Sequence, residues 1–266
     1  MNLISLSTFD LSLAALLVLG LAITTTLLGL GLGRQLLIAG LRTTVQLLLV
    51  GLILKFLFEN LHLGWMSLVA GIMLVAAGYE VMQRQKHRFR GAWGYGMGTF
   101  SMFISSFSLT LFSLIVLIGN EPWYQPQYAI PLLGMMLGNT MSGISLGLDR
   151  LTQSAKQQRA TIEARLMLGH TASQAISIIR SDSMRVGMIP MINAMAAAGL
   201  VSLPGMMTGQ ILAGSPPLEA VKYQILIMFL IKVGTGFGTM VAVWLGARRL
   251  FDERHRLRLE RLVSRS

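Results

Sequence analysis

The chain of 266 residues is 53% hydrophobic and 12% charged, and its formal net charge is +11 at pH 7. Soluble domains carry about a quarter charged residues, so this composition excludes an ordinary water-soluble fold and indicates a membrane protein. The basic residues lie between and after apolar runs, as they do on the cytoplasmic side of membrane proteins, so the charge does not indicate a nucleic-acid partner. The absence of cysteine excludes disulfides and thiolate metal sites.

The apolar run nearest the N-terminus is the first predicted span. It extends over residues 11–32, which is too long for the hydrophobic region of a signal peptide, and no basic residue precedes it. We therefore expect it to be a permanent membrane-spanning helix.

Seven apolar stretches are long enough to cross a membrane, because about 30 Å of hydrocarbon requires roughly 20 helical residues. They cover residues 9–32, 36–58, 65–82, 92–118, 129–148, 187–213 and 221–247. We predict an all-α polytopic membrane protein with a transmembrane domain at 1–247, a cytoplasmic two-helix loop at 149–186 within it, and a basic cytoplasmic tail at 248–266.

The charges of the connecting loops alternate along the chain. Arg34 lies in the first loop, a basic cluster lies at 84–90 in the third, and the fifth loop is the longest basic segment. The second, fourth and sixth loops instead carry Glu59, Glu121 and Glu219. Because basic loops stay on the cytoplasmic side, we predict that the N-terminus lies outside and the C-terminus inside the plasma (inner) membrane.

Aromatic residues mark the predicted outer boundary. Trp65 opens the third span, and Trp123, Tyr124 and Tyr128 lie near prolines in the fourth loop. Such residues anchor helices at the membrane interface, and a ligand-stacking role for this group is the alternative.

The fifth loop has the pattern of two helices that meet at a glycine. Residues 152–168 are rich in helix formers, and Gly169 follows as a residue suited to end that helix. Thr171 and Gln174 have the spacing of a capping box that starts a second helix.

The same loop contains a candidate contact site for a motor protein. Glu163, Ala164 and Gly169 have the E-A-x-x-x-x-G spacing that resembles the loop by which importer permeases contact their ATPase. The loop departs from that pattern at Arg165, where a second Ala would stand, and at Asp182, where a Pro would stand. An ordinary solvated helical loop is the alternative. The predicted ATPase-coupling residues are Glu163, Ala164, Gly169, Thr171, Gln174, Arg180 and Asp182.

The chain lacks the G-x-x-x-x-G-K-[ST] phosphate-binding loop of nucleotide hydrolases. We therefore expect a transport subunit rather than an enzyme, with no cofactor of its own and with ATP bound by a separate subunit.

The most specific pattern in the chain lies between residues 199 and 224. It reads G-L-V-S-L-P-G-M-M-T-G at 199–209, I-L-A-G at 211–214 and A-V-K-Y-Q at 220–224. Further matches lie at Arg42, Gln46, Gly51 and Lys55, at 134–139 and at 180–190. These residues resemble the FetB-type ABC transporter permeases, a family that includes bacterial permeases associated with iron efflux and the plant aluminium-tolerance permease.

The resemblance implies a permease that works with a separate ATP-binding subunit and exports a metal ion such as iron. In plants the proposed cargo is a nucleotide sugar, so the cargo stays open. Because ABC transporters need two membrane halves, a homodimer is also expected. The alternatives are a secondary transporter driven by an ion gradient, for which Glu80 is the one candidate carboxylate, and a membrane scaffold or sensor without transport.

The sixth predicted span is interrupted by Pro204 and Gly205. Non-helical backbone survives at membrane depth only against protein or a water-filled cavity, and broken helices often mark transport sites. A purely structural turn is the alternative. Candidate residues along a translocation path are Arg42, Gln46, Glu80, Asn139, Asn193, Ser202, Pro204, Gly205, Met206, Met207, Gln210 and Lys232.

Charged residues within the spans are costly to bury and are the next candidates. Arg42 and Glu80 have compatible depths in neighbouring antiparallel spans, so we hypothesise an ion pair between them that either serves transport or only fixes packing. Lys232 lies near the middle of the seventh span, where it either faces a wet cavity or extends toward the interface.

Small and sulfur-containing residues suggest two further contacts. Gly134, Gly138 and Ser142 repeat every fourth residue, which permits close helix approach, with Asn139 hydrogen-bonding across the contact. Methionines at 188, 191 and 195 share one helical face, which suits either a soft metal ion or flexible core filling.

The basic tail has leucines interspersed among arginines between 248 and 265. This pattern predicts a helix that lies against anionic lipid, and contact with the ATPase is the alternative.

Overall fold

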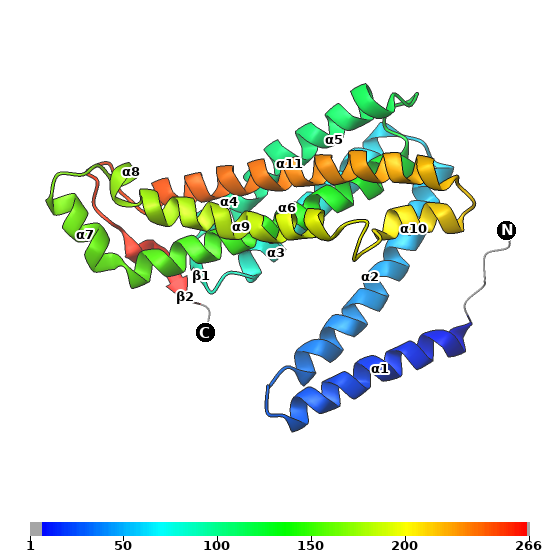
Figure 1. Cartoon of the computed structure of the whole chain (residues 1–266), viewed down its shortest axis with the longest axis horizontal. Coiled ribbons are helices and arrows are strands. Elements are labelled where there is room, and N and C mark those ends of the chain that lie inside the picture. Colours follow the sequence, from blue (N-terminus) through cyan, green and yellow to red (C-terminus); the bar gives the residue numbers. More distant parts are fainter. Residues whose placement is uncertain (1–6, 265–266) are drawn as a thin grey trace. The chain divides into compact units, whose positions relative to one another are not determined.

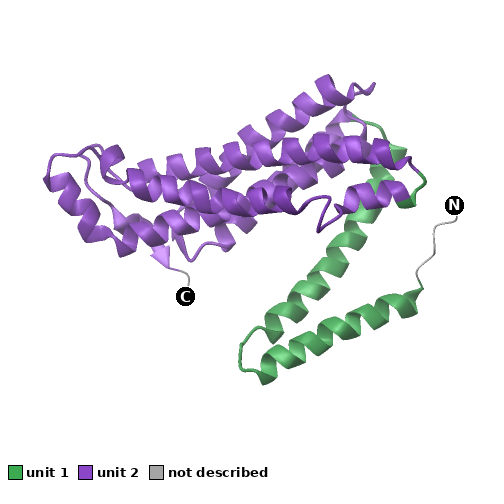
Figure 2. Ribbon diagram, viewed as in Figure 1, with its two compact units in different colours: residues 1–62, 212–214 green, residues 63–211, 215–266 purple. Residues whose placement is uncertain are grey.

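The computed structural model of the protein describes residues 7–264, and helices dominate them. The chain forms two compact units (Figure 2), one made of residues up to 62 with 212–214, and the other of residues 63–211 and 215–266.

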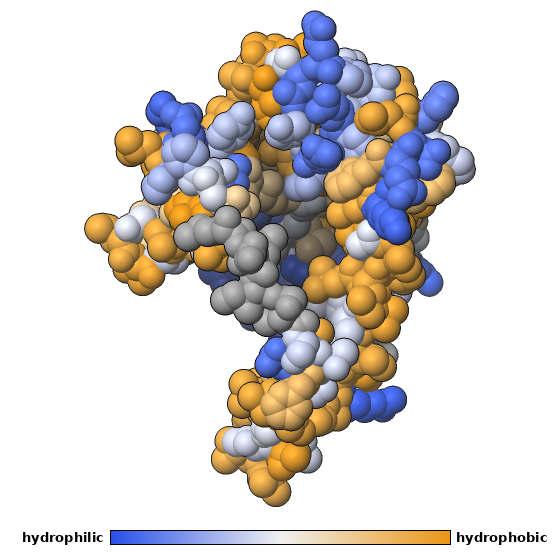
Figure 3. Space-filling view, turned by 90° about the vertical axis from the view of Figure 1, so that its right-hand side faces the viewer, coloured by the Kyte–Doolittle hydropathy of each residue, from blue (hydrophilic) through white to orange (hydrophobic). Residues whose placement is uncertain are grey.

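The first unit is a hairpin of α1 (Thr8–Leu27) and α2 (Gly33–Glu59). Ser7 caps α1 by accepting a hydrogen bond from the backbone N–H of Asp10, while the Asp10 carboxylate accepts one from the Ser7 N–H. Gly29 and Gly31 make the turn with φ of +69° and +66°, a region that glycine enters without strain. Most side chains of both helices are exposed and apolar, as lipid-facing helices require (Figure 3).

The second unit contains the remaining elements (Figure 1). Its helices and strands are α3 (Leu63–Gln83), β1 (His87–Phe89), α4 (Ala92–Met102), α5 (Ser108–Phe112), α6 (Pro126–Gln157), α7 (Arg159–Met167), α8 (Ala172–Ala175), α9 (Ser177–Ala197), α10 (Gly205–Leu212), α11 (Pro217–Arg249) and β2 (Leu262–Ser264).

Two π-helical turns interrupt the helix that runs from Ala92 to Ile118. They are η1 (Phe103–Phe107) and η2 (Ser113–Ile118), and they flank α5. Five hydroxyl side chains of this helix are almost fully buried in the bundle, whereas Ser108 is exposed. The five are Ser101, Ser105, Ser106, Thr110 and Ser113. Phe103 and Val116 are 51% and 62% exposed, so the helix has a polar inner side and an apolar outer side.

Helices α6 and α11 run in the same direction and pack along most of their length. A Cβ added to Gly143 would lie 2.7 Å from Thr235, and one added to Gly147 would lie 2.8 Å from Val243. The residue numbers of the contacting positions therefore increase together along α6 and α11, as they do in parallel helices. A Cβ added to Gly134 of α6 would lie 3.3 Å from Met73 of α3. The Arg84 guanidinium, just after α3, donates to the Ser142 hydroxyl of α6 at 3.3 Å. Helix α3 is therefore also parallel to α6.

Helix α9 runs in the opposite direction between α6 and α11. A Cβ at Gly187 would lie 2.7 Å from the carbonyl oxygen of Gly143 and 2.6 Å from Thr239, while the carbonyl oxygen of Ser183 lies 3.4 Å from a Cβ at Gly147. The three helices can approach this closely because their contact positions lack side chains.

Six helical segments within residues 7–264 are long and apolar enough to cross a membrane: α1, α2, α3, residues 92–118, α6 and α11. They match six of the seven predicted spans. The predicted span at 187–213 is instead the end of α9 followed by residues 198–204 and α10. Helix α9 is less apolar because its first half carries Arg180, Asp182 and Arg185.

The predicted amphipathic helix in the tail is wrong. After α11 the chain folds back through a bridge between Phe251 and Leu257 and a short 3-10 turn, η3 (Leu259–Arg261). Strand β2 then pairs antiparallel with β1, with His87 opposite Ser264. We call this two-stranded pair the C-terminal ribbon. The leucines of the tail do not line one helical face. Leu250 and Leu262 are instead buried in the core of the unit.

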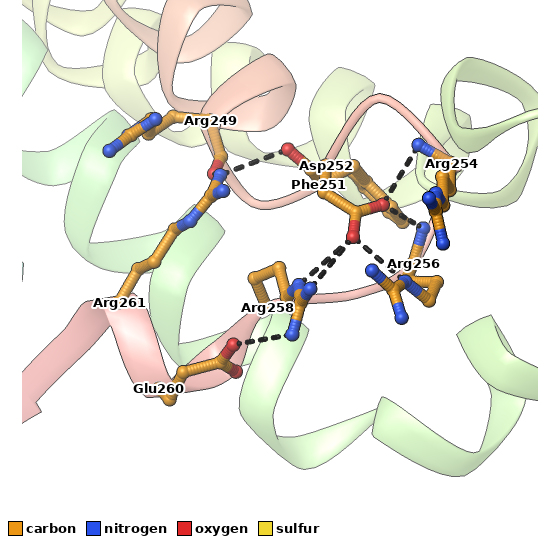
Figure 4. A network of polar contacts seen from close by, with 8 residues as sticks. All are labelled: Arg249, Phe251, Asp252, Arg254, Arg256, Arg258, Glu260 and Arg261. Atoms are coloured by element: carbon orange, nitrogen blue, oxygen red, sulfur yellow. Dashed lines mark hydrogen bonds and ion pairs between the residues drawn. The ribbon is translucent and has the colours of Figure 1, made fainter.

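A network of arginines around Asp252 holds the tail in this path (Figure 4). The Asp252 carboxylate accepts from the backbone N–H of Arg254 and Arg256 and from the guanidinium groups of Arg256 and Arg258. Arg261 donates to the carbonyl oxygens of Arg249 and Phe251 at 2.8 and 3.0 Å. Because Arg249 ends α11, this network fixes the tail to that helix.

Close packing of α9 predicts an effect of adding one methyl group. In Gly187→Ala the new Cβ meets the backbone of α6, so α9 must move, and such overpacking costs about 1–3 kcal/mol. We expect a lower midpoint of thermal unfolding in detergent. Gly71→Ala is the matched control, because nothing lies within 4 Å of its Cβ, and it should not lower the midpoint. Equal midpoints for the two variants would contradict the close packing.

Four groups of the tail donate hydrogen bonds to the Asp252 carboxylate, so we expect removal of its charge to loosen the tail. The pKa of Asp252 lies well below its usual range, first because the Arg256 backbone N–H donates to it and then because the Arg256 side chain pairs with it. A depressed pKa stabilises the fold above the unfolded-state pKa of about 3.9, and this contribution is lost as the pH falls further. The wild-type tail should therefore stay closed at neutral pH.

We expect Asp252→Asn to open the tail at pH 7.5 and to speed trypsin cleavage after Arg254 and Arg256. Glu253→Gln is the control, because the exposed Glu253 lies outside the network. Cleavage of Asp252→Asn at the control rate would show that the network does not hold the tail.

Candidate functional site

The clearest candidate site is the bend made by α7, Gly169 and α8, residues 159–175, which we call the elbow. Helix α7 ends in a Schellman motif: the Gly169 N–H donates to the carbonyl oxygen of Leu166 at 3.0 Å, and the His170 N–H donates to that of Arg165 at 3.2 Å. Gly169 has φ of +88°, which side chains other than glycine rarely adopt. The predicted role of Gly169 as the end of the helix is thus confirmed, although the first helix begins at Arg159 and not at Thr152.

The predicted capping box starts the second arm of the elbow. The Thr171 hydroxyl accepts from the Gln174 N–H at 3.4 Å, and the Gln174 side-chain carbonyl accepts from the Thr171 N–H at 2.9 Å. Helix α8 has only four residues, and after Ile176 the chain continues as α9. The elbow therefore leads directly into the helix that packs against α6 and α11.

The two sides of the elbow differ in burial. Ile162, Ala175 and Ile176 are 1–2% exposed and join the hydrophobic core of the unit. Met167 and Leu168, at the bend itself, are 82% and 79% exposed. The core thus holds the base of the elbow, while the tip of the elbow exposes two large apolar side chains.

Charged residues of the predicted coupling set form local pairs. Glu163 pairs with Arg159 at 2.7 Å within α7, Asp182 of α9 pairs with Arg150 of α6 at 2.8 Å, and Arg180 donates to Ser173 at 3.1 Å. The ion-paired side chains are 39–65% exposed, and such pairs contribute at most about 1 kcal/mol each. Buried apolar contacts are therefore the main support of the elbow.

The tail lies beside the second arm of the elbow. The Nδ1 atom of His255 lies 3.4 Å from the backbone N of Ala172. A cavity of about 590 Å³ is lined by Ala172 and Ser173 of the elbow, by Phe251 of the tail, and by Arg180 of α9 and Trp244 of α11. The ribbon also reaches α6: His87 of β1 lies 3.4 Å from Lys156, and burial and then this positive charge lower the pKa of the imidazole.

The path candidates Arg42 and Gln46 lie on exposed parts of α2. Glu80 lies in the second unit, where its carboxylate is 4.0 Å from Arg84, the residue that follows α3. The hypothesised pair between Arg42 and Glu80 stays a prediction.

Asn139 does not hydrogen-bond across a helix contact as predicted. Its side-chain amide donates to the carbonyl oxygen of Met135 in its own helix at 2.9 Å. Gly138 has open space where its Cβ would be, so the predicted close approach along 134, 138 and 142 is wrong at its centre. The glycines that carry the closest contacts of α6 are Gly143 and Gly147.

Lys232 is 8% exposed and thus packs inside the bundle. Among residues 7–264 no hydrogen bond or ion pair to its amine is present.

Asn193 is exposed on α9. Met188 and Met191 lie within 4 Å of a Cβ added to Gly236 of α11, as core-filling methionines do. No group of three His, Cys, Asp or Glu side chains that could hold a metal ion occurs in the described part of the chain.

The broken segment connects α9 and α10. Gly199 has φ of +84° and donates to the carbonyl oxygen of Ser202 at 2.9 Å, which closes a turn before Pro204 and Gly205. Leu200, Val201 and Leu203 are 92%, 86% and 64% exposed. The break lies at 198–204, slightly earlier than the predicted Pro204–Gly205, and it presents three apolar side chains outward.

Helix α10 carries the last path candidates. The N–H of Met207 donates to the side-chain carbonyl of Gln224 in α11 at 3.3 Å, and Met207 is 8% exposed. Met206 and Gln210 instead line a cavity of about 420 Å³ between α6, α10 and α11. The structure thus brings two of the predicted residues together in one cavity and leaves Asn139 and Asn193 outside its lining.

The chain is similar to known proteins over most of its length. Residues 8–251 match the family described as "Uncharacterised protein family (UPF0014)". The chain is 41% identical to the UPF0014 membrane protein slr1647 of Synechocystis over 230 residues, which are 86% of this chain and 88% of that protein. It is 31% identical to Protein ALUMINUM SENSITIVE 3 of Arabidopsis thaliana, over 77% of this chain and 73% of that protein.

A third relative is the "Probable iron export permease protein FetB" of Escherichia coli. The identity is 37% over 162 residues, which are 58% of this chain and 62% of that protein. No solved structure matches the chain. The family match covers the hairpin, the elbow and the broken segment, and with six apolar helices the chain is therefore a membrane protein that belongs to the UPF0014 family.

Proposed function

We propose that the protein is the permease subunit of an ABC transporter that exports a small solute, with iron as the first candidate, using ATP hydrolysed by a separate subunit. The name of the Escherichia coli relative supports export of iron. The plant relative is named for aluminium sensitivity, which supports a different cargo as the second candidate.

The elbow is the observation that carries the proposal. A permease without a nucleotide site needs a rigid projection that a motor subunit can push. The elbow meets this need because its base is buried among Ile162, Ala175 and Ile176, while its tip exposes Met167 and Leu168. Exposed apolar pairs on a rigid support are typical of protein interaction sites.

Helix directions support seven crossings. Since α6 and α11 are parallel, a chain that crosses the membrane in both must cross back between them, and α9 followed by α10 provides that return. With the hairpin, α3 and the helix at 92–118 this gives seven crossings, which is an odd number. The basic residues near the elbow and in the tail then lie in the cytoplasm, with the N-terminus outside.

The elbow predicts where the ATPase binds. Leu168→Asp places a charge at the exposed tip without touching the core, and we expect it to reduce at least tenfold the vanadate-sensitive ATPase activity that remains bound to tagged protein purified from native membranes. Gln157→Asp is the matched control, because Gln157 is also exposed at this end of the bundle. If wild-type protein retains no ATPase activity, or if Leu168→Asp retains as much as the control, the proposal fails.

The broken segment supports a homodimer. Contacts of Met207 with Gln224 and of Met191 with Gly236 bracket residues 198–204 beside the apolar part of α11. Non-helical backbone at this depth cannot face lipid, and exposed Leu200, Val201 and Leu203 disfavour water, so another protein surface should cover them.

The absence of cysteine allows a direct test of this contact. We expect Val201→Cys to form a crosslink between two copies that carry different tags, when both are expressed together and treated with a short bis-maleimide. Ile72→Cys, on an exposed position of α3, is the control. Crosslinking of Val201→Cys between copies at only the control level would contradict a dimer contact at this segment.

A further inference from the structure

The cavity between α6, α10 and α11 has the features of a ligand site. Its volume is about 420 Å³, within the usual range for small-molecule pockets. Apolar side chains such as Leu132 and Ile227 form much of the wall. Polar or polarisable groups reach it from all three helices, namely Gln127, Tyr128, Met135, Met206, Gln210 and Tyr223.

One group in this cavity lacks a partner. The side-chain carbonyl oxygen of Gln210 is buried and accepts no hydrogen bond within residues 7–264. Leaving a buried acceptor unsatisfied costs about 1–3 kcal/mol, so its presence calls for an explanation. By contrast, Gln224 on the neighbouring helix has its carbonyl oxygen occupied by the Met207 N–H. A ligand that donates an N–H or O–H to Gln210 would remove this cost.

The lining also sets the charge of the ligand. None of the residues that line the cavity is acidic or basic. A bare divalent ion or a phosphate would lose its hydration here without gaining a countercharge, which is strongly unfavourable. The two tyrosine rings and the methionine thioethers instead favour a flat, polarisable and largely apolar body.

We propose that this cavity binds an uncharged, aromatic-sized organic molecule that donates a hydrogen bond to Gln210 and packs between Tyr128 and Tyr223. The proposal rests on the proposed transport function, because it names the class of solute that the permease accepts beside α10, the helix that follows α9. A metal ion would pass this point only inside a neutral organic complex.

The probe for this site is 4-aminobenzophenone, which is uncharged and carries an N–H donor. On irradiation its ketone attacks C–H bonds beside methionine sulfur, so binding is recorded as label on Met135 and Met206 after digestion and mass spectrometry. The protein is used at full length in lipid nanodiscs. Met195, which is 39% exposed on α9 and outside the cavity lining, reports the background from probe dissolved in lipid.

We expect label on Met135 and Met206 to exceed that on Met195, and Gln210→Leu to reduce it about three- to tenfold, the loss expected for one hydrogen bond. Gln210→Met should do the same, since it keeps the side-chain length and removes the acceptor. Gln158→Leu, at the other end of α6, should label as wild type does. Benzophenone-4-carboxylate, of similar size but charged, should label the two methionines weakly.

Either of two results would overturn the proposal: label that is unchanged in both Gln210 variants, or equal labelling by the charged probe. The background label on Met195 and the thermal midpoint show whether the variants are folded. Labelling needs no ATPase, so its outcome is separate from that of the elbow test. A labelled cavity in a protein that retains no ATPase would preserve the site and remove the ABC assignment.

Discussion

The close contact of α6, α9 and α11 at Gly143, Gly147 and Gly187 is the constraint on which the second unit depends. At these positions the backbone of α9 is separated from α6 by less than the width of a side chain. Within a bilayer, helices gain little from excluding water and associate through van der Waals contact, so small residues at the contact decide which helices pair. Here they place α9 between two parallel helices in one register.

Helix α9 connects the elbow with the broken segment. Only Ile176 separates α8 from α9, which extends for 21 residues, or about 30 Å, to the broken segment. Ile176 and Ile179, at its beginning, are buried in the same core as α11. A displacement of the elbow would therefore be passed along α9, in which Pro190 removes one backbone hydrogen bond. Residues 198–204 follow at the end of the helix.

Local signals in the sequence were sufficient for some features. The Thr171–Gln174 capping box and the glycine end of α7 involve residues within six positions of one another, so composition and spacing predict them. Six spans were equally evident from their apolar length.

Other features depend on partners that are distant in the sequence. The leucines interspersed among the arginines of the tail predict a helix, whereas its path in the structure includes pairing with β1, more than 170 residues away. Helix α6 offers two stripes of small residues, at 134–142 and at 143–147, and only the position of α9 decides that the second carries the contact. The unpartnered Gln210 is also invisible in sequence, because burial without a partner is a property of the packed bundle.

The two π-helical turns between Phe103 and Ile118 have a consequence for how this span tolerates genetic change. A π turn accommodates one extra residue within a helix, and η1 lies in the five-residue step from Ser101 to Ser106, which a regular α-helical repeat would not keep on one side. From Ser106 the buried hydroxyls of Thr110 and Ser113 follow at α-helical intervals. Deleting a single residue here would rotate every later side chain, exposing hydroxyls to lipid and directing phenylalanine and isoleucine inward. Frame-preserving deletions in this span should be tolerated far less often than substitutions at its outer positions.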